Sequence, residues 1–414
     1  MHKSHNQNTV RYYIALVACL IFLFLSNDFG LVDVQKTAIV MAVGIDREEE
    51  TFIVTSQIAI PQSSKQGKQT EAVQIVSRGK TVADAFKQIN AKTGWYPKLV
   101  FCNLILLGNS TTQQNVFDIL DFFLRDEYLS DNCFVATTNG TAKALLNTSA
   151  LVDPSSNIAM EKVLSAHAQQ AGNVYPATLR EFAMGYFSDS QSGFLPILKT
   201  EPQQEQIGSD GAPENNSSTN SSSASDSSAN DASAGDSGQS PPPKDKPVFS
   251  AGETALFLAG KRVGTLSAEE TFALCAVENK LRLAPYSVAQ GDNTCTLTIR
   301  HNAPKISFSV TENERAHLKI KLTLSSGTLD YSKALDLDKV RDVGNEIAGT
   351  FALAEKKLAA EIRSAFEKCR KSGCDLFGLQ EKLQKYEKAH FHALSDSVLP
   401  GAILDVEVHF RNVR

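Results

Sequence analysis

A long polar segment in the middle of the chain limits what the rest can fold into. Residues 201–247 are mostly Ser, Asn, Asp, Gly and Pro, with scarcely an aromatic or branched apolar side chain. This composition cannot bury enough apolar surface to offset the entropy lost on ordering. We predict a disordered, mildly acidic linker there, and hence two folded domains, at 31–200 and 248–414, in line with the usual domain size.

The N-terminal segment, residues 1–30, contains the most apolar run of the chain. Tyr12–Leu25 is a stretch of about fourteen residues without a charge. Basic residues precede it and acidic residues follow it, so the positive-inside bias predicts that the rest of the chain lies outside the cytoplasm. The sequence therefore directs the search for function to a membrane surface.

Three fates of this run are open. An uncleaved anchor is favoured, although a spanning helix needs about twenty apolar residues and would have to recruit flanking ones. Cys19 follows Leu-Val-Ala, which fits the pattern of a lipidated cysteine, but the apolar residues Leu20–Leu25 would then begin the mature chain. Cleavage near Ser26 as a signal peptide is the third fate.

Charge and cysteine content exclude some classes of function. The net charge is -5 and the pI is about 6.0, so the chain lacks the basic character typical of nucleic-acid binding. The seven cysteines show no CxxC spacing. Cys102 and Cys133 lie in strand-like runs and could meet across a sheet, but buried free thiols are the favoured interpretation.

The first domain alternates strands and helices. The stretch Thr81–Asp84 is typical of a capping box, and it opens a helix that ends at Gly94. Apolar runs and apolar periodicity predict the other elements. Strands are expected at 36–46, 51–60, 72–77, 98–107 and 133–138, and further helices at 113–124, 159–170 and 178–186.

The second domain combines a meander of strands with one long helix. Apolar side chains recur at three- and four-residue spacing from Val340 to Phe366, which predicts an amphipathic helix lying across a sheet. Strands are expected at 253–258, 295–300, 305–311, 317–324 and 404–411, with shorter helices from Ser267 and at 376–386. The predicted fold class is α+β: two mixed domains with largely antiparallel sheets packed by helices, joined by the linker.

A search for chemistry finds no catalytic or cofactor motif. The chain has no GxxxxGK[ST] loop, no GxGxxG after a strand, no HExxH and no GxSxG. His390 and His392 form the one close histidine pair, but no third metal ligand is apparent, and a solvated loop is the favoured interpretation. We therefore predict no enzyme activity, no cofactor and no metal.

Two charged features remain as candidates. Asp46 ends an apolar strand directly after Gly44, where a carboxylate commonly accepts backbone N–H bonds. Arg125 and Asp126 end a helix, and arginine can offer a rigid bidentate donor to a partner. A structural role is the favoured interpretation for each of them.

Several segments together resemble a known family. They are Ala38–Asp46, Ile119–Asp126, Tyr175–Phe182, Gly252–Ser267 and Cys374–Gly378. Their order and spacing are similar to those of the C subunit of bacterial spore germinant receptors, the Ger(x)C family. The resemblance covers most of the chain outside the linker.

The resemblance implies a non-enzymatic accessory or scaffold subunit on the outer face of the spore inner membrane. It would act by protein contacts beside an A subunit and a polytopic B subunit, and help nutrients trigger germination. It marks Gly44, Asp46, Arg125 and Asp126 as motif or interaction residues. Gly252, Gly264 and Gly378 would be turn positions.

The chain departs from the family pattern in two respects. Family members are usually lipoproteins, yet the segment Asn27–Phe29, where their lipidated cysteine is expected, contains none, and Cys19 lies too early. The linker is also unusually long. The alternative function is an extracytoplasmic, membrane-anchored binding protein with its own small-molecule ligand, and a cell-envelope hydrolase is a distant third.

Overall fold

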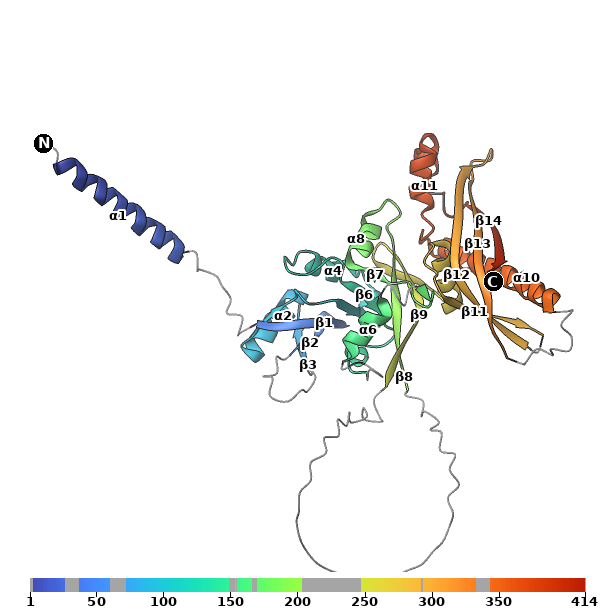
Figure 1. The fold of residues 1–414 in the computed structure, drawn as a ribbon, viewed down its shortest axis with the longest axis horizontal. Helices are drawn as coiled ribbons and strands as arrows, with labels where there is room; N and C mark the ends of the chain where they lie inside the picture. The colour runs from blue at the N-terminus through green and yellow to red at the C-terminus, as the bar shows by residue number, and fades with distance from the viewer. Residues whose placement is uncertain are drawn as a thin grey trace, which may run out of the picture.

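A computed structural model describes most of the chain outside the predicted linker (Figure 1). Residues 203–246 of that linker lie outside the described residues, as does the segment Asn27–Phe29. The described ranges are 3–26, 37–59, 72–148, 153, 155–165, 170–202, 247–291, 293–332 and 343–413.

The N-terminal segment forms the helix α1, Lys3–Ser26. Its side chains from residue 11 to residue 22 are exposed, Cys19 among them. Within the part of the chain that the structure describes, no helix is both long enough and apolar enough to cross a membrane.

Among the described residues, ten strands form a mixed sheet, which we call the first sheet. Its main path runs β10-β9-β8-β6-β5-β1-β2-β3, while β4 pairs with β1 and β7 pairs with β6. The centre is parallel, because β5 pairs in parallel with both β1 and β6, and the outer pairs are antiparallel. The strands are β1 Thr37–Glu48, β2 Thr51–Ala59, β3 Ala72–Gly79, β4 Tyr96–Lys98, β5 Leu104–Leu107, β6 Phe134–Thr137, β7 Ala177–Thr178, β8 Ser192–Glu201, β9 Val248–Leu258 and β10 Lys261–Leu266.

Helices cover both faces of this sheet. One core lies under α2, α4 and α8, and a smaller one lies under α5 and α6, so alternate residues of the buried strand β5 point into different cores. Thr81 caps α2, its Oγ1 accepting the backbone N–H of Asp84 at 3.1 Å, and Gly94 ends it with φ +73°. The helices are α2 Val82–Thr93, α3 Asn109–Thr112, α4 Phe117–Leu124, α5 Ala142–Leu146, α6 Ser156–Leu164 and α8 Leu179–Phe187.

The first sheet continues across the linker. β8 and β9 are antiparallel neighbours, and the last pair in their register joins Glu201 to Val248. β9 and β10 therefore complete a sheet that began before the linker, although they follow it in sequence. The domain boundary at 248 stays a prediction. The strands on its two sides, β8 before the linker and β9 after it, are hydrogen-bonded to each other.

A second sheet of four strands stands beside the first (Figure 1). Its order is β11-β12-β13-β14, and the last strand runs parallel to β13. The long helix α10 packs on β14 and on α9, and its apolar stripe enters the largest core. The elements are β11 Ala284–Gln290, β12 Asn293–Val310, β13 Ala316–Tyr331, β14 Ile403–Asn412, α9 Ala268–Val277, α10 Val343–Ser372, α11 Leu379–Tyr386, the 3-10 helix η3 Lys388–His390 and α12 Phe391–Leu394.

The mixed α+β class is confirmed, and some elements differ from their prediction. The apolar run 98–107 is not one strand, because a turn separates β4 from β5. The two strands expected between 295 and 311 are one long strand, β12. Cys102 and Cys133 are buried and form no disulfide. A hydrogen bond with the Cys102 thiol, aided by burial, raises the pKa of Cys133.

Candidate functional site

Asp46 lies buried near the end of β1 and caps a helix that is distant in sequence. Its Oδ1 accepts the backbone N–H of Ala142 at 2.8 Å, and its Oδ2 accepts that of Lys143 at 3.0 Å. These are unpaired donors of the first turn of α5, where a carboxylate is favourable. Burial raises the pKa of Asp46, and these two hydrogen bonds oppose that rise.

Two glycines make room for this contact. A Cβ at Gly44 would lie 2.9 Å from Cδ1 of Leu146, and a Cβ at Gly108 would overlap Oδ1 of Asp46. The motif residues Gly44 and Asp46 therefore join β1 to α5 inside the fold. Their assignment as family motif or interaction residues stays a prediction.

Arg125 and Asp126 lie at the surface, at the end of α4. Arg125 is exposed, and its Nε donates to Oδ2 of Asp121 at 2.7 Å, one helical turn earlier. Oδ1 of Asp126 accepts the backbone N–H groups of Tyr128 at 2.9 Å and Leu129 at 3.1 Å. Asp126 thus shapes the turn that presents the exposed ring of Tyr128.

The three glycines expected in turns are in different settings. Gly252 and Gly264 lie within the strands β9 and β10, so the prediction of turns is wrong for both. A Cβ at Gly264 would lie 3.3 Å from Cδ1 of Leu256, which is why the close packing of β10 suits a glycine there. Gly378 has φ +64° and precedes α11, where a left-handed residue is required.

The segment Cys374–Gly378 ties the C-terminal part of the chain to the first sheet. Asp375 is buried and accepts the backbone N–H groups of Leu379 at 2.9 Å and Gln380 at 2.8 Å, so it caps α11. The Cys374 thiol donates to the carbonyl oxygen of Phe257 in β9 at 3.3 Å. This motif therefore stabilises the junction between the two sheets.

Glu270 joins α9 to α10. It is the third residue of a capping box with Ser267, and it also accepts Nζ of Lys368 and Oγ of Ser364, both at 2.7 Å. Burial opposes ionisation of this carboxyl group, but the hydrogen bonds from Lys368, Ser364 and the Ser267 backbone outweigh it and lower its pKa. Glu270 is thus held as a charged tie between two helices.

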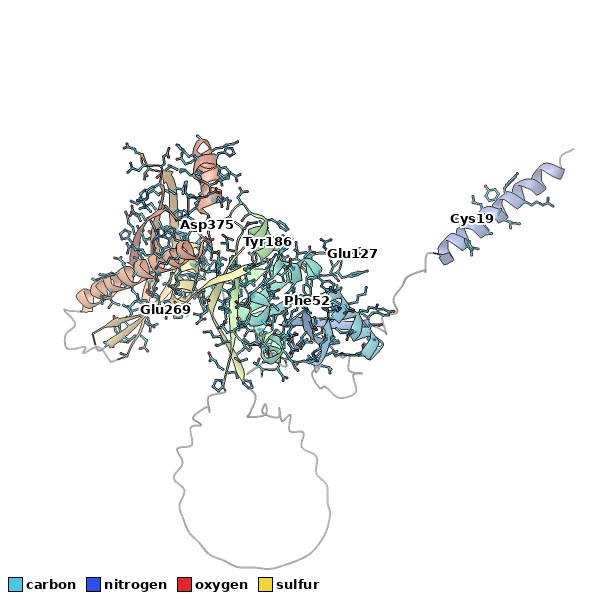
Figure 2. All side chains as sticks on the ribbon, turned by 180° about the vertical axis from the view of Figure 1, so that it is seen from behind. Cys19, Phe52, Glu127, Tyr186, Glu269 and Asp375 are labelled. Carbon is cyan, nitrogen blue, oxygen red and sulfur yellow. The ribbon has the colours of Figure 1, made fainter. Side chains whose placement is uncertain are left out.

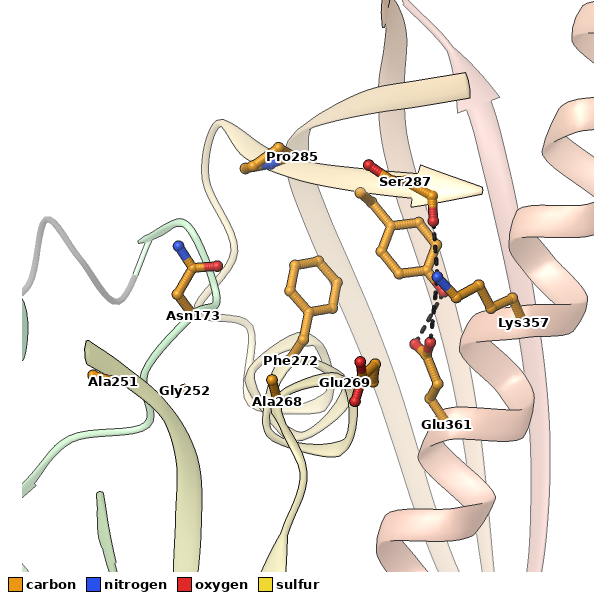
Figure 3. Close-up of a pocket in the computed structure, with 11 residues that line it drawn as sticks. Asn173, Ala251, Gly252, Ala268, Glu269, Phe272, Pro285, Ser287, Lys357 and Glu361 are labelled. Carbon is orange, nitrogen blue, oxygen red and sulfur yellow. Dashed lines mark hydrogen bonds and ion pairs between the residues drawn. The ribbon is translucent and has the colours of Figure 1, made fainter. Parts of the chain in front are cut away.

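An open pocket lies where the two sheets meet (Figure 3). It has a volume of about 290 Å³ and lies between Gly252 of β9, Phe272 of α9, β11 and α10. The ring of Phe272 is stacked against that of Tyr286, with centroids 5.2 Å apart. The pocket is therefore apolar on one wall and charged on the other.

The charged wall consists of groups that largely satisfy one another. The hydroxyl of Tyr286 donates to Oε2 of Glu361 at 3.0 Å, and Nζ of Lys357 donates to the Ser287 carbonyl oxygen at 2.8 Å (Figure 3). Nζ of Lys357 lies 3.7 Å from Oε1 of Glu361 and 4.9 Å from the centroid of the Tyr286 ring. This arrangement holds β11 on α10.

Glu361 makes the stability of this wall depend on pH. Burial raises the pKa of Glu361 above that of an unfolded glutamate, so the folded state binds its proton more tightly and becomes less stable as pH rises through the folded pKa. A Glu361→Gln variant has no carboxyl group to ionise at this position, so it lacks this loss of folding stability. We expect the variant to gain stability relative to the parent chain as pH rises from about 4 to 8, measured by urea unfolding.

The matched control is Glu312→Gln, which removes an exposed carboxylate. Equal pH profiles for the Glu361 and Glu312 variants would contradict the role assigned to burial at Glu361.

The close histidine pair of the sequence, His390 and His392, lies among the residues that the structure describes. His390 and His392 lie in η3 and α12, and Nδ1 of His390 is 3.6 Å from Oε2 of Glu387. Among the residues that the structure describes, no three His, Cys, Asp or Glu side chains are grouped so that they could hold a metal ion.

The sequence matches two family models in chain order. The model described as "Spore germination protein N-terminal domain" covers residues 31–200, and the model described as "Spore germination B3/GerAC like, C-terminal" covers residues 252–413. The chain belongs to the GerAC-like family of spore germination proteins. The resemblance predicted from the sequence motifs is confirmed.

Relatives of this GerAC-like chain support the assignment. Spore germination protein A3 of Bacillus subtilis (strain 168) is 27% identical over 188 residues, which are 43% of this chain and 49% of that protein. Spore germination protein B3 of the same strain is 25% identical over 146 residues, 34% of this chain and 36% of that protein. The matches span half or less of these relatives.

A solved structure has the same fold. The crystal structure of the GerBC protein aligns with a TM-score of 0.51 and 15% sequence identity, over 90% of this chain and 97% of that one. At this identity the likeness speaks for the fold alone.

The structure does not bring the predicted site residues together. Asp46 is buried on β1 of the first sheet, whereas Arg125 and Asp126 lie just after the C-terminal end of α4. Sequence reasoning missed the pocket wall around Tyr286 and Glu361, because its residues come from a strand that was not predicted and from a helix interpreted only by its apolar stripe. It also missed the exposed apolar side chains on α8, because the residue type alone does not show whether an apolar side chain is exposed or buried.

Proposed function

We propose that this GerAC-like chain is a membrane-attached accessory subunit of a nutrient germinant receptor, acting by contacts with the A and B subunits on the outer face of the spore inner membrane. Family membership supports a place in a receptor complex. It does not favour the alternative of an independent small-molecule binding protein. The motif residues Asp46 and Asp375 support a non-catalytic role, because the carboxylates of both accept backbone N–H groups that hold the fold together.

One surface carries the proposal of protein contacts. On α8, Met184 and Phe187 are 66% and 72% exposed. Phe187 meets the ring of Phe117 edge-on at 4.9 Å, and Phe117 is stacked on Tyr186 at 4.1 Å. Exposed aromatic and methionine side chains on a rigid support are typical of a contact surface. We name Met184, Tyr186 and Phe187 the α8 surface, and its two rings rest on the buried ring of Phe117 in α4.

Attachment to a membrane has support of a different kind. The side chains of α1 from residue 11 to residue 22 are exposed and mostly apolar. An exposed helix that is apolar on all sides is unfavourable in water and favourable in lipid. We therefore include α1 in the proposal as the part that holds the subunit at the membrane.

The test replaces the chromosomal gene by a Met184→Ser/Phe187→Ser variant in the spore-forming host. We expect nutrient-triggered germination to slow at least tenfold, because the variant loses the apolar anchors of the contact. Recovery of the A and B subunits with the purified chain should fall to the same degree.

The control is Leu283→Ser, another strongly exposed apolar side chain, which should leave both measurements unchanged. Deletion of the gene sets the lower limit of germination. Unaltered germination with every nutrient after deletion, in a host without related receptors, would sink the proposed function. Unaltered recovery of partners by the α8 variant would remove this surface from it.

A further inference from the structure

A tight turn in the first domain has apolar residues at its tip. The N–H of Cys102 donates to the carbonyl oxygen of Leu99 at 2.9 Å, so Val100 and Phe101 occupy the two central positions. These two side chains are 49% and 59% exposed, whereas Leu99 and Cys102 are buried. Turn centres usually carry Gly, Asn, Asp, Pro or Ser, so an exposed Val-Phe pair has no local structural reason.

Aromatic side chains extend this apolar tip. Tyr96 and Lys98 lie two residues apart in β4 and therefore on the same face, and Tyr96 is exposed. Nζ of Lys98 lies 3.9 Å from the centroid of the exposed Tyr128 ring, in the turn that Asp126 shapes. We name Tyr96, Lys98, Val100, Phe101 and Tyr128 the aromatic rim.

The aromatic rim is close to the place where the chain enters the first domain. β4 pairs in parallel with the beginning of β1, with Thr37 opposite Tyr96. Residues 27–36 connect β1 to the end of α1, and ten residues span at most about 35 Å. Figure 2 shows Glu127, the neighbour of Tyr128, on the opposite side of the folded part from Glu269, which lies toward the second sheet.

We propose that the aromatic rim is a lipid-docking surface that rests on the same membrane to which α1 is attached. Tyrosine rings favour the headgroup level of a bilayer, where lysine can keep its ammonium group in water. Val100 and Phe101 project from a narrow turn, so they can enter the acyl boundary without burying neighbouring backbone. The inference rests on the proposed membrane attachment, and it adds a fixed orientation of the domain on the lipid surface.

The chain contains its own reporter for this contact. Trp95 is the single tryptophan and directly precedes Tyr96. The full chain is reconstituted into phosphatidylcholine vesicles whose acyl chains carry bromine, either near the glycerol end or near the methyl end. We expect Trp95 fluorescence to be quenched, and more strongly by the shallow bromines than by the deep ones.

The decisive variant is Val100→Ser/Phe101→Ser. Serine is well accepted at turn centres, so the fold should persist, which circular dichroism can verify. Quenching by shallow bromines should fall at least twofold. Met184→Ser/Phe187→Ser, which changes the α8 surface instead, should leave quenching as in the parent chain.

The outcomes separate the two proposals. A chain that floats with the vesicles but shows no quenching of Trp95, or equal quenching in the parent and the Val100/Phe101 variant, overturns the lipid-docking surface alone. A chain that does not float with the vesicles contradicts both membrane attachment and lipid docking. A change in Trp95 fluorescence that appears only when the receptor partners are added, and not with vesicles alone, would assign the aromatic rim to a protein and overturn the proposal.

Discussion

The Glu270→Ala variant is expected to lower the free energy of unfolding by about 3 kcal/mol. The change removes a capping-box acceptor, for which about 1 kcal/mol is typical, and the charged acceptor of the Ser364 hydroxyl, for which about 2 kcal/mol is typical. Nζ of Lys368 loses its partner but can reach water, because the side chain is only half buried. Urea unfolding followed by circular dichroism measures the loss.

Two further variants separate the contributions at Glu270. Glu270→Gln keeps an acceptor for the cap and for Ser364, so its loss should be about half as large. Lys368→Met should cost no more than about 1 kcal/mol. Because the pKa of Glu270 is lowered on folding, the advantage of glutamate over glutamine should vanish as pH falls through that pKa. A loss below about 1 kcal/mol for Glu270→Ala would contradict the role of this tie.

Asp46→Ala is expected to cost a similar amount, about 3 kcal/mol. It leaves two N–H donors of α5 unpaired in a buried place, and each lost partner of that kind costs about 1–3 kcal/mol. The result would show that this family motif residue contributes to the stability of the fold. Unfolding in urea is again the measurement, and α5 should become the least protected helix in amide hydrogen exchange.

Asp126→Ala is the matched control for Asp46. Asp126 also accepts two backbone N–H groups with one carboxylate, but its turn is open to water, which can replace the lost acceptor. We expect a loss of about 1 kcal/mol or less. Similar losses for the two aspartates would mean that burial of Asp46 contributes nothing, against the geometry described above.

Local patterns in the sequence predicted most elements, because each depends on neighbours along the chain. The apolar stripe predicted the helix that the structure describes from Val343 onward, its first residues lying outside the described ones, and the caps at Thr81 and Ser267 open helices where they were expected. Strand pairing across the linker could not be predicted, because no local signal says that β9 belongs beside β8. The turn at Val100 and Phe101 was missed because its four residues, Leu99–Cys102, include none of the residues that mark turns.

The sequence identified the family but not the way its motifs work. Asp46 was expected to accept backbone N–H groups, but no local pattern indicated that they belong to α5, which begins 96 residues later. The family resemblance implied turns at Gly252 and Gly264, and both lie in strands; at Gly264 the close approach of Leu256 suits a residue without a side chain. Such roles depend on which elements meet in space.

The pairing of β8 with β9 has a consequence for how the chain tolerates being cut. Glu201 and Val248 are partners on adjacent strands, so both ends of the intervening segment lie at one edge of the protein. A protease that cleaves between them would yield two bands on a denaturing gel and one particle in solution. The halves on either side of the cut would behave as a split protein that stays assembled through its shared sheet.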